Sequence, residues 1–243
     1  MRKQLSLFIT GIVLVLIGAV LCIVSMVVLG FRFDSLDNQK LVTAEYNVTE
    51  EFRDIQIKLE GEKVVFETSK DDKCRVVFYD AEETERKVSV EDGVLNIMTE
   101  GTKKHGIEVM NVRIRPSKVT IYLPENVYGS LIIESAFGGV EIPEGYSFDT
   151  VKIDIAMGET ELNGVVASKE ISVMTNAGDI DLDNCDAPEI YLKTNTGDIS
   201  GTLLTGKIFK VHVTVGDIEV PGDGDGGICE ITTNVGDVRM KIR

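Results

Sequence analysis

The chain has 243 residues, 43% of them hydrophobic, and a formal net charge of −15. Arg2 and Lys3 are the only charged residues among the first 30 and contribute +2, so residues 31–243 carry −17. Such an acidic chain repels phosphate backbones and anionic lipid headgroups, which argues against nucleic acid as a partner.

Residues 5–30 are predicted to form one transmembrane helix. Residues 5–29 contain no charge, and a helix of that length rises about 37 Å, more than the roughly 30 Å hydrocarbon core of a bilayer. Basic residues precede the block and acidic residues follow it, so residues 1–4 are expected in the cytoplasm and the C-terminal domain outside. Two alternatives stay open: a signal peptide cleaved at Gly30 and, less favoured because Leu21 precedes it, lipidation of Cys22.

Residues 31–52 are predicted to be a juxtamembrane linker, and residues 53–243 one folded domain. Its first part, 53–130, is expected to hold an entry coil at 53–80, where Ile55, Ile57 and Leu59 alternate before Gly61 in a register shifted from that of later coils. The elements expected next are a hairpin of 87–91 and 94–99 around the Asp92-Gly93 turn, a loop at 101–106, and strands at 109–115 and 118–123.

Residues 131–243 repeat themselves with a period of about 20 residues. The repeat is marked by six glycines spaced 20, 20, 19, 19 and 20 residues apart: Gly138, Gly158, Gly178, Gly197, Gly216 and Gly236. Each glycine is expected at a sharp corner that needs a positive φ. A fixed period of this length indicates a repeat architecture.

Apolar side chains recur at fixed offsets from each glycine. Five residues before it stand Ile133, Ile153, Val173, Leu192, Val211 and Ile231, and the intervening residues alternate with a period of two. This alternation is typical of strands with one buried face, and coils this short hold two or three strands each. The sequence therefore predicts an all-β fold: a single-stranded parallel β-helix, or solenoid, whose rungs of about 20 residues stack at about 4.8 Å.

The chain is expected to end in the outermost rung. There Val238, Met240 and Ile242 alternate with basic residues at 239, 241 and 243. Alternating basic side chains protect an open sheet edge from pairing with another molecule. Docking of an acidic partner is the alternative.

One residue after the last four corner glycines comes an acidic row, Asp179, Asp198, Asp217 and Asp237. Stacked carboxylates repel one another, so the row is expected to stay solvated and to accept hydrogen bonds from turn amides. Calcium binding is the less favoured alternative, helped slightly by Asp223 and Asp225 in the PGDGDGG segment, although that segment lacks the spacing of a calcium-binding hand. No cofactor is expected.

Little in the sequence suggests catalysis. His105 and His212 are isolated, and the cysteines beyond the anchor (Cys74, Cys185 and Cys229) are too few and too scattered for a disulfide framework. Cys229 falls in an apolar ladder and is predicted to be a small core residue. No nucleophile, metal-ligand or phosphate-loop motif is present in the sequence.

The recurring TNAGDI, TNTGDI and TNVGDV units, with the Ile-Tyr-Leu-Pro segment at 121–124, resemble the bacterial β-strand-repeat family of unknown function named putative adhesin. The resemblance covers about residues 53–243 and implies a β-helical protein of the bacterial cell envelope without established catalytic residues. The first two repeats depart from the unit, with Gly139 and Glu159 where later coils have aspartate.

The favoured hypothesis is a non-catalytic binding or scaffold protein, held in the cell membrane by one span and displayed outside. Its expected partner is an envelope protein or glycan. The alternative is an envelope-stress sensor that acts through a membrane partner, because four cytoplasmic residues cannot signal alone. A polysaccharide-acting β-helix enzyme is a remote third hypothesis, resting on fold analogy. The sequence does not fix the oligomeric state.

Overall fold

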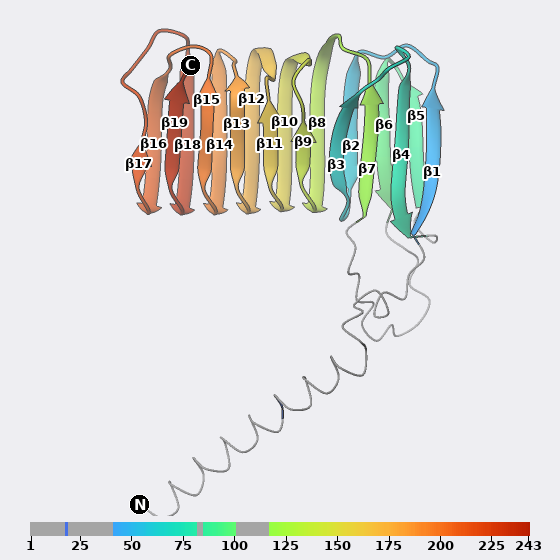
Figure 1. The fold of residues 1–243 in the computed structure, drawn as a ribbon, viewed down its shortest axis with the longest axis horizontal. Coiled ribbons are helices and arrows are strands. Elements are labelled where there is room, and N and C mark those ends of the chain that lie inside the picture. The colour runs from blue at the N-terminus through green and yellow to red at the C-terminus, as the bar shows by residue number, and fades with distance from the viewer. Residues whose placement is uncertain (1–17, 19–40, 82–84, 101–116) are drawn as a thin grey trace, which may run out of the picture. The chain divides into compact units, whose positions relative to one another are not determined.

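The computed structural model describes residue 18 and residues 41–81, 85–100 and 117–243 (Figure 1). In this part of the chain no helix is long and apolar enough to cross a membrane. The predicted cytoplasmic stub, nearly all of the predicted span, the loop at 101–106 and the strand at 109–115 lie outside the described residues. The described strands all belong to one of two compact units, Leu41–His105 with Pro116–Arg243.

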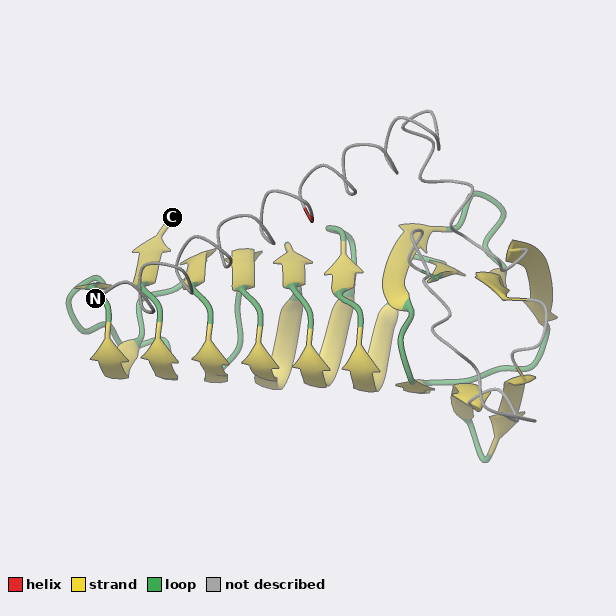
Figure 2. Ribbon diagram, turned by 90° about the horizontal axis from the view of Figure 1, so that it is seen from below, coloured by secondary structure: helices red, strands yellow, loops and turns green. Residues whose placement is uncertain are grey.

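The described strands form an all-β fold of two mixed sheets, and Figure 2 shows the sheets viewed along their strands. The ten-stranded sheet has the order β1 (Leu41–Val48), β4 (Cys74–Ala81), β7 (Lys118–Leu123), β3 (Lys63–Thr68), β9 (Val140–Ile142), β11 (Thr160–Asn163), β13 (Ile180–Cys185), β15 (Ile199–Leu203), β19 (Val238–Ile242) and β17 (Ile218–Glu219). The nine-stranded sheet has the order β16 (Ile208–Val215), β18 (Ile228–Val235), β14 (Glu189–Thr196), β12 (Val166–Ala177), β10 (Ser147–Met157), β8 (Val127–Phe137), β2 (Asp54–Leu59), β6 (Val94–Glu100) and β5 (Glu85–Glu91).

Each repeat coil gives one strand to each sheet and pairs in parallel with the coils beside it. Ile153 of β10 lies between Ile133 of β8 and Val173 of β12, and all three side chains are at most 1% exposed. The space between the sheets is filled by such aliphatic ladders. Each coil is stabilised by packing its aliphatic side chains on those of the adjacent coils. One period of the sequence therefore corresponds to one coil of the structure.

The prediction that residues 31–52 form a linker is wrong for residues 41–48. Residues 41–48 form β1, which pairs antiparallel with β4, and the ring of Tyr46 meets that of Phe78 edge-on at 5.9 Å. Glu45 lies on the exposed side of this strand, while Ala44, Tyr46 and Val48 pack against the core. The folded unit therefore begins twelve residues earlier than the sequence suggested, at Leu41 rather than residue 53.

The entry coil keeps the register of the later coils instead of being shifted. Ile57 of β2 pairs with Ile133, and Val64 of β3 pairs with Val140. Glu62, only 4% exposed, thereby takes the place of a corner glycine. Its carboxylate accepts hydrogen bonds from the backbone N–H of Gly61 (3.0 Å) and the hydroxyl of Thr99 (3.2 Å). Strands β5 and β6 then form the antiparallel hairpin around Asp92-Gly93.

The last two coils do not stack in chain order. The C-terminal strand β18 lies between β14 and β16, and β19 lies between β15 and β17. The expectation that the chain ends in the outermost rung is therefore wrong. Val238 and Met240 are buried, and the outermost coil is the preceding one, β16–β17 (Figure 1).

The buried side chain of Lys207 stabilises the connection by which the chain returns from β17 to the inserted strand β18. Lys207, 1% exposed, lies before β16, and its ammonium donates to the carbonyl of Gly226 and the hydroxyl of Thr205 (2.7 Å) and pairs with Asp186. The return segment, residues 220–227 between β17 and β18, passes so close that a Cβ on Gly224 would lie 2.4 Å from the carbonyl carbon of Gly206. Glycines are needed here because two backbones touch.

Candidate functional site

The acidic row is a hydrogen-bonded ladder. The backbone N–H of Asp198 donates to Oδ1 of Asp179 at 2.8 Å, and that of Asp237 donates to Oδ1 of Asp198 at 2.8 Å. The N–H of Asp217 donates to Oδ1 of Asp237 at 2.9 Å. The carboxylates of Asp179, Asp198 and Asp237 therefore each accept a hydrogen bond from a corner amide of the next coil in the stack, a structural use of aspartate.

The Thr-Asn residues of the repeat unit also form hydrogen bonds with the neighbouring coil. Nδ2 of Asn195 donates to Oδ1 of Asn176 (3.0 Å), and Nδ2 of Asn234 donates to Oδ1 of Asn195 (3.2 Å). The buried hydroxyls of Thr194 and Thr233 donate to glycine carbonyls of the preceding coil. The polar groups of the corner are thus largely satisfied within the stack, which leaves few of them available for a ligand.

The proposed calcium residues do not converge on one point. Within the described ranges no group of three or more His, Cys, Asp or Glu is placed to hold a metal ion. Asp223 and Asp225 are exposed on the return segment. Arg239 forms ion pairs with Asp198 (4.0 Å) and Asp237 and so offsets repulsion along the row. The N–H of Asp217, and then Arg239, hold the pKa of the Asp237 carboxyl below its ordinary value.

The ladder predicts that Asp198→Ala lowers the melting temperature of the full-length protein by about 2–4 °C, because the N–H of Asp237 loses its acceptor. Asp198→Asn retains an oxygen acceptor and should melt near the wild type. Thermal unfolding with EDTA and with millimolar calcium should give the same curve. A large rise with calcium, abolished by Asp198→Asn together with Asp217→Asn, would show instead that the row binds the cation.

The three described cysteines are buried and free. Burial raises the pKa of the thiols of Cys74, Cys185 and Cys229 to about 12 in each case. Since the thiolate is the nucleophile, these groups are unreactive near neutral pH. His212 is exposed on β16, and His105 lies outside the described residues.

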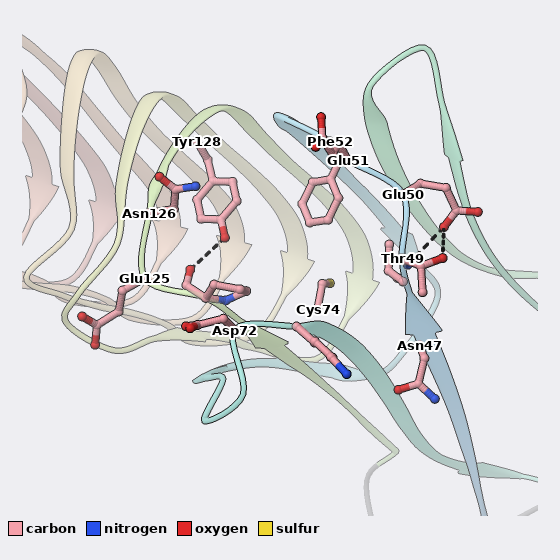
Figure 3. A pocket seen from close by; sticks show the side chains of 13 residues that line it. Asn47, Thr49, Glu50, Glu51, Phe52, Asp72, Cys74, Glu125, Asn126 and Tyr128 are labelled. Carbon is pink, nitrogen blue, oxygen red and sulfur yellow. Dashed lines mark hydrogen bonds between the residues drawn. The ribbon is translucent and has the colours of Figure 1, made fainter.

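An open groove of about 960 Å³ lies where the repeats meet the N-terminal strands (Figure 3). Three segments line it: residues 47–52, residues 72–74, and residues 124–126 with Tyr128. The ring of Tyr128 lies between two others, parallel to Phe52 at 6.1 Å and tilted against Phe148 at 5.9 Å. The Tyr128 hydroxyl donates to the carbonyl of Pro124 (2.7 Å), so the aromatic wall is held rigidly.

The groove is acidic. The carboxylates of Glu50, Glu51, Asp72 and Glu125 line it against one ammonium, that of Lys73. Backbone N–H groups, its own and that of Thr49, hold the pKa of the Glu50 carboxyl below its ordinary value. A negative opening with an aromatic wall favours positively charged groups, which gain both Coulomb attraction and contact with a ring face.

Sequence reasoning missed this groove. One of its walls comes from the segment that was predicted to be linker, and the other two come from turns that are distant in sequence. The available signal was the alternation of Ala44, Tyr46 and Val48, followed by an aromatic residue at 52.

Comparison with known proteins identifies the family of the domain. Residues 52–243 match the family Toastrack DUF4097. No curated protein shows a significant match. A putative cell adhesion protein from Clostridium sporogenes is 19% identical, with 84% of this chain and 100% of that chain covered and a TM-score of 0.46. A putative adhesin from Bacteroides fragilis is 18% identical, with 85% and 99% covered and a TM-score of 0.45.

A putative lipid binding protein from Parabacteroides distasonis is 14% identical, with 84% of this chain and 98% of that chain covered and a TM-score of 0.31. The family match spans more than half of the chain and includes every repeat coil together with the turn of residues 124–126 that lines the groove. The chain therefore belongs to the Toastrack DUF4097 family.

Proposed function

We propose that this chain is a non-catalytic binding protein of the bacterial cell envelope, anchored in the membrane by residues 5–30 and displaying the β-solenoid outside. The uncharged block behind Arg2 and Lys3 supports the anchor and its orientation. The described part of the chain supports the non-catalytic role, because its thiols are buried and its acidic row binds its own backbone.

The proposed binding function rests on the groove. In the repeats, corner side chains hydrogen-bond to the next coil, which makes the stack a stiff scaffold. The groove instead presents carboxylates and the half-buried ring of Phe52 to solvent. The partner that fits this chemistry is a positively charged segment of another envelope protein.

The location is tested with protease added to intact cells or spheroplasts that produce the full-length protein. The solenoid should be degraded while cytoplasmic marker proteins survive. Complete protection of the domain, or a mature chain that lacks residues 1–30, would contradict the anchored outward orientation.

The binding half is tested with a fluorescent lysine-rich peptide and the full-length protein in detergent. We expect binding that weakens with salt and falls at least about tenfold in Glu51→Lys with Glu125→Lys. Asp181→Lys with Asp183→Lys, on the exposed face of β13, changes the net charge by the same amount and should bind like the wild type. Equal loss in the control would show nonspecific attraction to an acidic protein.

A further inference from the structure

A row of apolar side chains runs along the edge of the solenoid at which the corner glycines lie. Its members each stand one residue before a corner glycine, and the strand register sets them side by side in the order Phe137, Met157, Ala177, Thr196, Val235 and Val215. We call these six residues the apolar row. Phe137, Met157, Val235 and Val215 are 52%, 47%, 49% and 60% exposed. At about 4.8 Å per coil the row is about 24 Å long.

The opposite edge of the same sheet has exposed apolar side chains too, but polar residues separate them. Val127 and Val166, 65% and 38% exposed, lie on either side of Ser147, and Val166 is followed in the next coil by Asp186. Single exposed apolar residues of this kind are ordinary on a protein surface. A row that keeps an apolar side chain or a methyl group in each of six adjacent coils is instead typical of a contact surface.

The apolar row lies at the edge of the domain at which the folded chain begins. Leu41 pairs with Ala81 at the start of β1, and the register continues through β4, β7 and β3 to Val140, two residues after a corner glycine. Figure 1 accordingly shows the start of β1 at the same edge as the arrowheads of β8, β10, β14 and β18. Ten residues, 31–40, separate the predicted membrane span from Leu41, and even fully extended they reach at most about 36 Å.

We infer that this edge of the solenoid lies on the lipid bilayer, with the apolar row in the boundary between headgroups and acyl chains. The inference rests on the membrane anchor of the proposed function. Because the anchor holds the edge close to the bilayer, the local concentration of lipid is high and a weak apolar contact suffices. The stack of coils then runs along the membrane. The acidic groove lies at the other ends of the strands and faces outward, since the eight residues of β1 span about 27 Å.

The charges beside the apolar row favour a zwitterionic lipid surface. The aspartates of the acidic row come one residue after the corner glycines, so they lie on the side of the ten-stranded sheet, whereas the apolar row lies on the side of the nine-stranded sheet. Their carboxylates would repel anionic headgroups. Zwitterionic headgroups carry an ammonium group as well as a phosphate, so the carboxylates can stay among hydrated headgroups while the apolar row lies deeper.

Tryptophan fluorescence tests this contact, because the chain contains no tryptophan of its own. Met157→Trp and the control Val127→Trp replace exposed residues at opposite edges of the same sheet. Each full-length variant is reconstituted into vesicles of phosphatidylcholine, either plain or brominated near the headgroup end of its acyl chains. Bromine should lower the emission of Met157→Trp at least about twofold and leave that of Val127→Trp unchanged. Quenching at both sites, at neither, or at Val127→Trp alone would overturn the inference.

Charge changes in the Met157→Trp protein test whether the row as a whole makes the contact. Val215→Glu with Val235→Glu should abolish quenching, because entry of the row would then remove two carboxylates from water. Val127→Glu with Val166→Glu makes the same charge change at the opposite edge and should leave quenching intact. Quenching that survives the first pair of changes would show that the introduced tryptophan alone enters the lipid, and would overturn the role of the row.

Flotation of the vesicles after an alkaline wash separates failure of this inference from failure of the anchor. Protein that is washed from the vesicles would overturn the membrane anchor and the lipid contact together. Protein that stays with the vesicles but shows no quenching of Met157→Trp would overturn the lipid contact and leave the anchor standing.

Discussion

Ile231→Asp is expected to prevent folding of the solenoid. Ile231 is fully buried, and its strand is enclosed by β14 on one side and β16 on the other. An ionised carboxylate in this ladder would have no partner, and the cost of burying it is comparable with the whole stability of a domain, about 5–15 kcal/mol. We expect loss of soluble, folded full-length protein and of its β-sheet circular dichroism.

Val211→Asp is the matched comparison, because the two residues are direct partners across one strand pair. Val211 stands in the outermost strand and is only partly buried, so a carboxylate there can reach water. The variant should fold and lose much less stability in urea unfolding. Stacking in chain order would make Val211 internal and Ile231 terminal, so a more severe effect of Val211→Asp would contradict the inserted C-terminal coil.

The repeat could be predicted because its signal is local and redundant. Period-two alternation marks the strands, and the corner glycines mark where the chain turns. Each of the six has a positive φ, from 102° at Gly138 to 155° at Gly158. These features depend on residues a few positions apart, so they are visible without knowledge of which coil lies next to which.

The order of the last coils could not be read from periodicity, because every coil satisfies the same pattern. One local departure is informative in retrospect. The fifth unit reads VTVGDI, with Val213 and Thr214 where the flanking units have Thr-Asn. The asparagine ladder runs from Asn176 through Asn195 to Asn234 and omits this coil. A coil without the ladder residues belongs at the end of the stack.

The groove was beyond sequence reasoning for a different reason. It depends on three turns that meet only because β1 and β4 add antiparallel strands to a parallel sheet. The alternation in β1 is short, and nothing local specifies its partner strand. Contacts of this kind are set by tertiary packing, as β-propensity itself is.

Gly197→Ala should be severely destabilising although it adds a single methyl group. Gly197 has φ +148°, and a Cβ there would lie 2.1 Å from the carbonyl oxygen of Gly178 in the coil below. Relief of the clash must separate two coils that are joined by the aspartate and asparagine ladders. Backbone strain and overpacking each cost about 1–3 kcal/mol, so we expect a loss of about 3 kcal/mol or more in urea unfolding.

Gly222→Ala is the control for this effect, since no atom lies within 4 Å of the Cβ position and the residue belongs to the return segment. A change within about 0.5 kcal/mol is expected there, as at ordinary surface sites. If Gly197→Ala were as mild as Gly222→Ala, the coils would have room to separate at their corners. The close approach of Gly197 to Gly178 would then not require glycine at this position.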